Sequence, residues 1–190
     1  HAVDAADLLG MVNWTMLPFM TNIWEHLLKD VLPRLATKQR RIFIDLADPE
    51  KRLVEDLRTA LATAQKINDQ VHVILGLNLS EALQVAKAIG VAVPADPENN
   101  IEPLAVALRT KLGLGTVVVH PRKGAAAANK DGSAVFAGPF VQSPKISTGA
   151  GDHFNAGFVT GQLLGLNLAE SLAAGTGTSG YYVRNAESPT

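Results

Sequence analysis

A short stretch near the C-terminal end carries the residues best suited to chemistry. Residues 149–152, Gly-Ala-Gly-Asp, open an apolar run in which Phe154 and Phe158 recur at helical spacing, and this predicts a helix that begins at residue 149 or 150. The first N–H groups of a helix lack partners and carry partial positive charge, and glycine lets an anion approach them closely. The turn can therefore hold a phosphoryl oxygen, while Asp152 accepts a proton from a substrate hydroxyl.

Two interpretations of this segment are open. In the first, Gly-Ala-Gly-Asp is an ordinary turn into a helix, with an acid that stabilises the first turn. The second comes from a longer pattern, because residues 147–158 (Ser-Thr-Gly-Ala-Gly-Asp-His-Phe-Asn-Ala-Gly-Phe) closely resemble the C-terminal signature of the ribokinase-like sugar kinases, also called the phosphofructokinase-B family. The resemblance implies that Gly149, Ala150 and Gly151 form an anion hole for the transferring phosphate. It also implies that Asp152 is the catalytic base.

A second motif, Asn78-Leu79-Ser80-Glu81, lies about seventy residues earlier and opens an expected helix after an expected strand. By itself it is a helix cap followed by an acid in the first turn. Asn-x-x-Glu at this place also resembles the second marker of the same kinase family. That resemblance implies that Asn78 and Glu81 help to hold Mg²⁺, a cation that prefers oxygen ligands.

Other positions fall near the expected nucleotide site. Asp45 and Asp48 lie at the end of an expected strand, and each is either a cleft residue or a helix cap. The turn His-Pro-Arg-Lys-Gly occupies the place where relatives carry a Thr/Ser-x-Gly segment. The resemblance therefore implies that Lys123 and Gly124 bind the nucleotide, with a solvated basic turn as the alternative. Thr148, directly before the anion hole, is assigned to the nucleotide site in the same way.

Residues 175–180, Gly-Thr-Gly-Thr-Ser-Gly, formally match the dinucleotide-binding pattern G-x-G-x-x-G. That pattern must follow a strand and open a helix, whereas here it interrupts a helix-like run over residues 168–183. Small residues that allow close helix packing are therefore the favoured interpretation. In the sugar kinases this region lies near the nucleotide base, so it is also a candidate border of the adenine pocket. The P-loop pattern G-x-x-x-x-G-K-[ST] does not occur, which disfavours a P-loop kinase.

The elements expected around these motifs alternate between strands and helices. Short apolar runs predict strands at residues 8–12, 41–46, 71–75 and 115–120. Apolar stripes predict helices between them, with expected inward residues that include Ile23, Leu27, Val31 and Leu35 in the first helix and Leu53, Leu57 and Leu61 in the second. A turn at residues 129–132 predicts an antiparallel hairpin after the last of these strands. Such alternation predicts an α/β fold, with a mainly parallel sheet covered by helices on both faces.

The composition of the chain limits the classes of function that it can have. The 190 residues are 47% hydrophobic, which suits one domain with a substantial core. A net charge of −1 gives no general attraction to nucleic acid or to an anionic membrane. The lack of cysteine excludes thiol chemistry and fits a cytoplasmic protein. The chain begins at His1 rather than Met, and we expect one kinase domain over residues 1–190 that is incomplete at both ends and lacks the N-terminal substrate and lid portion.

The resemblance covers roughly residues 7–183. It implies a three-layer α/β/α sandwich of the ribokinase type and transfer of phosphate from ATP, with Mg²⁺, to an alcohol group of a sugar or sugar-like small molecule. The net charge predicts no nucleic-acid or membrane partner, and a homodimer is left open. The alternative is a non-catalytic nucleotide-binding or regulatory relative, or an inactive fragment, because the sugar-contacting segment of the family is not found.

Overall fold

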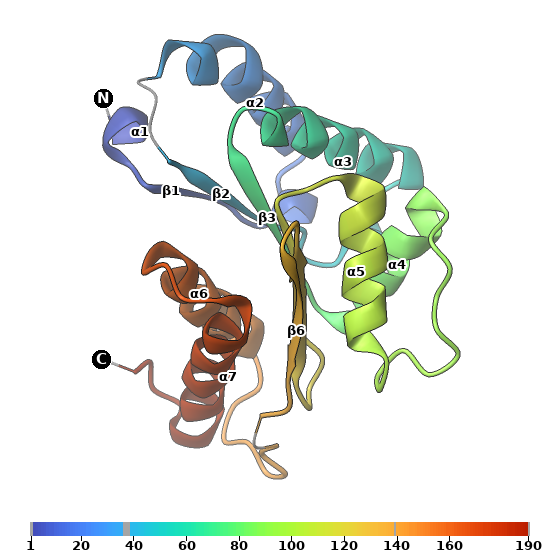
Figure 1. The fold of residues 1–190 in the computed structure, drawn as a ribbon, viewed down its shortest axis with the longest axis vertical. Helices are drawn as coiled ribbons and strands as arrows, with labels where there is room; N and C mark the ends of the chain where they lie inside the picture. Colours follow the sequence, from blue (N-terminus) through green and yellow to red (C-terminus); the bar gives the residue numbers. More distant parts are fainter. Residues whose placement is uncertain (1, 36–38, 139, 190) are drawn as a thin grey trace.

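The computed structural model describes residues 2–35, 39–138 and 140–189, and within them one six-stranded mixed sheet (Figure 1). The strands lie side by side in chain order: β1 (Leu8–Met11), β2 (Arg41–Asp45), β3 (His72–Leu77), β4 (Thr116–Val119), β5 (Ala125–Asn129) and β6 (Gly132–Phe136). β1 to β4 are parallel, and β5 and β6 are antiparallel. The predicted parallel strands and the following hairpin are confirmed.

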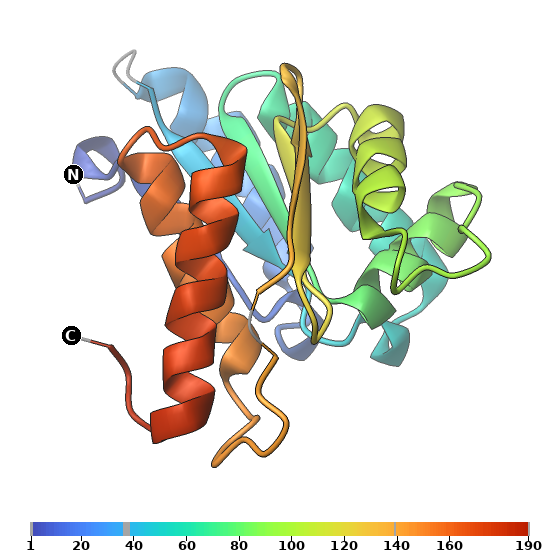
Figure 2. The ribbon, with the colours of Figure 1, turned by 60° about the horizontal axis from the view of Figure 1, so that its bottom comes forward.

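Helices cover both faces of this sheet. The chain places α2 (Met20–His26), α3 (Val54–Asn68), α4 (Leu79–Ile89) and α5 (Ile101–Leu112) on one face, and α6 (Ala150–Leu163) and α7 (Leu168–Asn185) on the other (Figure 2). A short helix, α1 (Ala2–Ala5), precedes β1. The predicted three-layer α/β/α architecture is therefore confirmed. Among the described residues, no helix combines the length and hydropathy needed to cross a bilayer.

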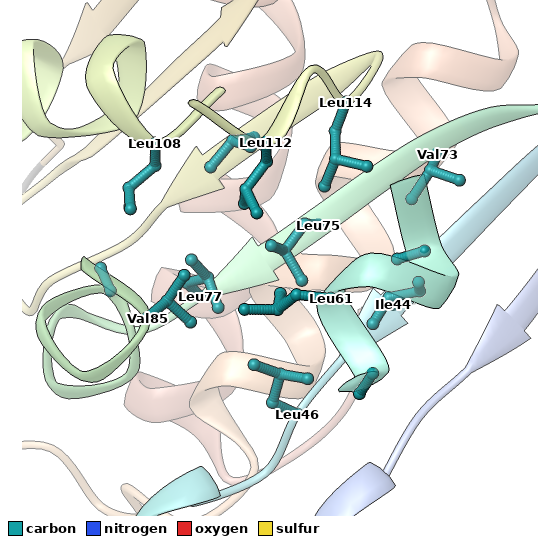
Figure 3. Packing of buried hydrophobic residues seen from close by; sticks show 14 of the residues in the cluster. Ile44, Leu46, Leu61, Val73, Leu75, Leu77, Val85, Leu108, Leu112 and Leu114 are labelled. Carbon is teal, nitrogen blue, oxygen red and sulfur yellow. The ribbon is translucent and has the colours of Figure 1, made fainter. Parts of the chain in front are cut away.

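The two faces of the sheet bury separate hydrophobic cores because successive strand residues point to opposite sides. Figure 3 shows the larger core, where Ile44 and Leu75 from the sheet lie near Leu61 of α3. Their strand neighbours Phe43 and Ile74 belong instead to the smaller core under α6 and α7. The helix that carries the Gly-Ala-Gly-Asp turn is thus held on a different face from the helix that carries Asn-x-x-Glu.

The predicted continuous helix over residues 23–35 is wrong. α2 ends at His26, and the chain continues as a π-helical turn, η2 (Leu27–Val31), and a 3₁₀ turn, η3 (Leu32–Arg34). Pro33 explains the interruption, because proline lacks an N–H donor and its ring crowds the carbonyl of the preceding turn.

The buried stripe of this segment also differs from the expected one. Ile23 is 53% exposed, whereas Met20 and Trp24 are buried; Leu27 is buried as expected. Burial of the large indole removes more apolar area from water than burial of isoleucine, which favours the rotation that is found. Leu53 is likewise not an inward residue, since it is the N-cap of α3 and 71% exposed.

Candidate active site

Three polar residues lie where the parallel strands end. Asp45 is the last residue of β2, Asn78 follows β3 directly, and His120 follows β4. The carboxyl ends of parallel strands share one edge of a sheet, which is where ligands bind in open α/β folds. The start of α6 reaches the same edge, because Asn155 Nδ2 donates a hydrogen bond of 2.9 Å to Asp45 Oδ2.

The Gly-Ala-Gly turn forms the predicted start of α6. Gly149 has φ of +88°, in the left-handed region that favours glycine, and α6 begins at Ala150. The Ala150 N–H donates to Ser147 O at 3.2 Å. Within the described part of the chain, the N–H groups of Gly151 and Asp152 have no acceptor. The turn therefore presents two free donors, at Gly151 and Asp152.

The outer side of this turn is held by α7. The Tyr182 hydroxyl donates to Thr148 O at 3.0 Å, and Ser179 Oγ donates to Ala150 O at 2.9 Å. The His153 ring stacks on Tyr182 with centroids 3.6 Å apart, and its Nδ1 lies 2.8 Å from Gly149 O. These contacts fix the backbone of the turn that carries the free N–H groups. Asp152, one residue further on, is exposed.

His120 lies against the inner side of the turn. Its Cε1 is 3.4 Å from the place that a Cβ on Gly151 would occupy, and its ring centroid is 4.6 Å from that of Phe154. Burial lowers the pKa of His120 from 6.5 to about 4. The imidazole is therefore neutral at pH 7 and adds no cationic charge to the anion hole. The sequence offered only its position at the end of an expected strand as a signal for this contact.

Acidification should therefore destabilise the fold through His120. The unfolded state binds the proton with an ordinary pKa of 6.5 and the folded state only near 4, so this contribution is present above pH 6.5 and is lost as the pH falls toward 4. We expect His120 to account for about 1–2 kcal/mol of the loss between pH 7.5 and pH 5. Urea unfolding of wild type and His120→Gln at both pH values measures this difference.

Burial also lowers the pKa of His72, but that residue is present in every variant and cancels in the comparison. An identical loss of stability on acidification in wild type and His120→Gln would show that His120 is not the responsible group.

Asn78 and Glu81 form a reciprocal capping box at the start of α4. Asn78 Oδ1 accepts from the Glu81 N–H, and Glu81 Oε2 accepts from the Asn78 N–H, both at 2.9 Å. Glu81 Oε1 accepts from the Asp48 N–H at 3.1 Å, so this carboxylate also holds the loop after β2. The cap interpretation is therefore confirmed. Glu81 is 5% exposed, and burial raises the pKa of its carboxyl.

Four carboxylates converge around this edge. Burial is the main cause of the raised pKa of Asp45, and the charge of Asp152 raises it further. The charges of Asp45 and Asp48 similarly add to the raised pKa of Glu81. Oxygen donors with unfavourable mutual repulsion suit a hard divalent cation such as Mg²⁺. Among the described residues no three acidic or histidine side chains are close enough to hold a metal alone, but Mg²⁺ usually keeps several waters and phosphate ligands.

The three residues expected at the nucleotide site are spread around the turn. Lys123 is exposed between β4 and β5, with Nζ 6.0 Å from the centroid of the Phe140 ring, and no hydrogen bond or ion pair joins it to another described residue. Gly124 allows close backbone approach, because a Cβ there would lie 2.8 Å from Phe136 O. Thr148 is exposed beside the anion hole. A nucleotide role for these residues stays a prediction.

Comparison with known proteins assigns this chain to a protein family. A family model described as prokaryotic ketohexokinase matches residues 1–190. A ketohexokinase of Haloferax volcanii is 28% identical over 188 residues, which are 99% of this chain and 49% of that protein. The chain thus spans about half the length of the curated relative that it matches.

Solved structures share the fold. The adenosine kinase of Trypanosoma brucei brucei matches with a TM-score of 0.75 and 17% identity over 97% of this chain and 53% of its own. The ribokinase of Thermotoga maritima matches with a TM-score of 0.68 and 22% identity over 98% of this chain and 53% of its own. These likenesses establish a ribokinase-like fold.

Proposed function

Because the chain belongs to the prokaryotic ketohexokinase family, we propose that this protein transfers the terminal phosphoryl group of ATP to a hydroxyl group of a ketohexose or a related sugar. The observation that carries the proposal is the pair of free N–H donors at Gly151 and Asp152, placed directly beside the exposed Asp152 carboxylate. A proton acceptor next to an anion-binding turn is the arrangement that phosphoryl transfer to an alcohol requires.

Each residue of the turn has a distinct part in this proposal. The Asp152 carboxylate accepts the proton of the attacking hydroxyl. The N–H groups of Gly151 and Asp152 donate to the oxygens of the transferring phosphoryl group, where negative charge must be stabilised. The Ala150 N–H already has an acceptor, so Ala150 contributes by shaping the turn, with Gly149 providing the left-handed backbone.

We further propose that Mg²⁺ is held near Asp48 and Glu81, directly or through water, with Asn78 fixing the Glu81 backbone. The cation would neutralise phosphate charge. ATP would approach past Thr148, Lys123 and Gly124. An enzyme that uses ATP and has no cysteine fits a cytoplasmic location, which is part of the proposal.

The direct test is phosphate transfer by the full-length protein. ADP release would be measured with ATP, Mg²⁺ and a panel of ketohexoses, aldohexoses and pentoses, and the sugar phosphate would be identified by mass spectrometry. The proposal expects ADP release that depends on a ketohexose. ATP binding without transfer to any member of the panel would favour the alternative of a non-catalytic relative.

Glu81→Gln should raise the Mg²⁺ concentration for half-maximal rate by several-fold, because it removes one negative charge from a site for a hard cation. The change also breaks a helix cap. The two carboxylate oxygens of Glu81 accept from two different backbone N–H groups, and glutamine has only one side-chain oxygen to accept them. The rate is measured as a function of free Mg²⁺ at saturating ATP.

The chain contains a matched control for the loss of the cap. Asn167 and Glu170 form a second capping box, at the start of α7, where Glu170 is exposed. Glu170→Gln should lower stability by a similar mechanism but leave the Mg²⁺ dependence unchanged. Equal Mg²⁺ dependence in Glu81→Gln and Glu170→Gln would show that Glu81 is only a structural cap.

A further inference from the structure

The first turn of α6 has few means of attachment to the sheet. Its residues up to Asp152 are glycine, alanine and an exposed acid, none of which inserts a large side chain into the core. The next residues toward the sheet make two contacts. Phe154 packs on the His120 ring, and Asn155 donates to Asp45. The aromatic contact can slide, whereas the hydrogen bond at 2.9 Å has a defined direction and length.

The polar contact is specific in its chemistry. A carboxylate only accepts hydrogen bonds, so the Asn155 amide must present Nδ2 to Asp45. The other oxygen, Asp45 Oδ1, accepts from the Ala47 N–H at 2.9 Å. Asn155 is 6% exposed, and its Oδ1 has no donor among the described residues. Both oxygens of Asp45 are therefore engaged, and the contact joins segments 110 residues apart in the chain.

The bond attaches the side of α6 that carries Asp152. Asn155 lies three residues after Asp152 and so on the same side of the helix. Its Nδ2 donates to Asp45 at the end of β2, and this sets the distance between that side of the helix and the strand.

Gly76 of β3 permits the close approach. A Cβ at this position would lie 3.1 Å from Asn155 Oδ1 and 2.7 Å from the end of the Phe43 ring. Its φ is not in the left-handed region, so the backbone itself would accept another residue. What glycine provides here is space for the Phe43 ring and for the Asn155 amide.

We propose that the Asp45–Asn155 hydrogen bond is the tether that positions Asp152 and the free N–H groups of the α6 start at the active edge. Asp45 and Asn155 are positioning residues, and Gly76 makes room for their contact. The inference rests on the proposed function for the role of Asp152. The tether itself can also be measured without any activity.

An exchange of the two side chains gives the sharpest test. In Asn155→Asp two carboxylates face each other, and in Asp45→Asn one amide must serve both the Ala47 N–H and the Asn155 N–H₂. The double variant Asp45→Asn/Asn155→Asp satisfies both contacts again, because the amide placed at position 45 accepts from the Ala47 N–H and donates to the carboxylate placed at position 155.

We expect each single change to lower kcat by about 10–100-fold with little change in KM for ATP, since small displacements of a reacting group are costly. The double variant should regain most of that loss.

The matched control is Asn22→Asp, the same change as Asn155→Asp at an exposed helical asparagine, which should leave kcat unchanged. Amide hydrogen exchange is measured in parallel. The single variants should exchange faster at residues 150–156, while residues 157–163 of α6 keep wild-type protection.

The two readouts separate the possible failures. If wild type transfers no phosphate, the proposed function fails, and the exchange data still decide whether the tether holds α6. If the single variants keep wild-type exchange at residues 150–156 and wild-type kcat, the tether is overturned. Failure of the double variant to recover either readout, when both single variants fold, would equally contradict it.

Discussion

Replacement of Asp152 by asparagine in the full-length protein is expected to lower kcat by about 10²–10⁴-fold, the usual cost of losing a general base. Asparagine has almost the same shape but cannot accept the proton of a substrate hydroxyl at neutral pH. The neighbouring N–H donors of Gly151 and Asp152 belong to the backbone and remain in place. ATP binding should therefore be preserved, or become tighter because one negative charge beside the phosphates is removed.

The measurements are kcat from initial rates at saturating sugar and the ATP dissociation constant from calorimetry. Asp131→Asn is the matched control, since Asp131 is an exposed acid in the turn between β5 and β6. That turn lies by the beginning of β4, at the opposite end of the sheet from the anion hole. If kcat is the same in wild type and Asp152→Asn, Asp152 is not the base.

The fold could be predicted from the sequence wherever residues close together in the chain determine the structure. Apolar runs and turn chemistry located the strands and the hairpin, and the glycines before Asp152 located the start of α6, confirmed at Ala150. The segment after Trp24 was not predictable to the same degree, because two helical faces are apolar there and only tertiary packing selects one. Pro33 was a visible signal for the end of regular helix.

In the candidate site, too, contacts between residues close in the sequence could be predicted, and contacts between distant residues could not. The reciprocal bonds of Asn78 and Glu81 connect residues three apart, and a sequence pattern can indicate them. The second bond of Glu81, to the Asp48 N–H, spans 33 residues, and the contact of Asp45 with Asn155 spans 110. Many polar residues follow the strands, and nothing in the sequence selects which of them meet. The register of the sheet and the close approach at Gly76 decide those pairs.

The glycine pattern at residues 175–180 was interpreted as helix packing, and the structure confirms this at one of its three glycines. A Cβ at Gly175 would lie 2.9 Å from Phe154 O across the contact between α6 and α7. Gly177 faces open space, and the nearest group to a Cβ at Gly180 is the Arg184 side chain at 3.5 Å. Close packing thus depends on Gly175 and on the facing glycines of α6.

Gly157 is the most restrictive of those facing glycines. A Cβ there would lie 2.5 Å from Thr178 Oγ1, 2.8 Å from Ala174 O and 2.9 Å from Gly175 Cα. Two of these three atoms belong to the backbone of α7 and cannot rotate away. The helices would have to separate, and separation would disturb the contacts of Tyr182 and Ser179 with the anion-hole turn.

Gly157→Ala is therefore expected to lower the free energy of unfolding by about 1–3 kcal/mol, the cost of overpacking a close contact. Gly177→Ala is the matched comparison, and there the same change should raise stability by up to about 1 kcal/mol, because alanine favours a helix over glycine. Urea unfolding of both variants measures the two shifts. The opposite signs follow from one structural difference, the presence or absence of α6 opposite the added methyl group. A gain in stability in Gly157→Ala would mean that α6 and α7 do not pack at this distance in solution.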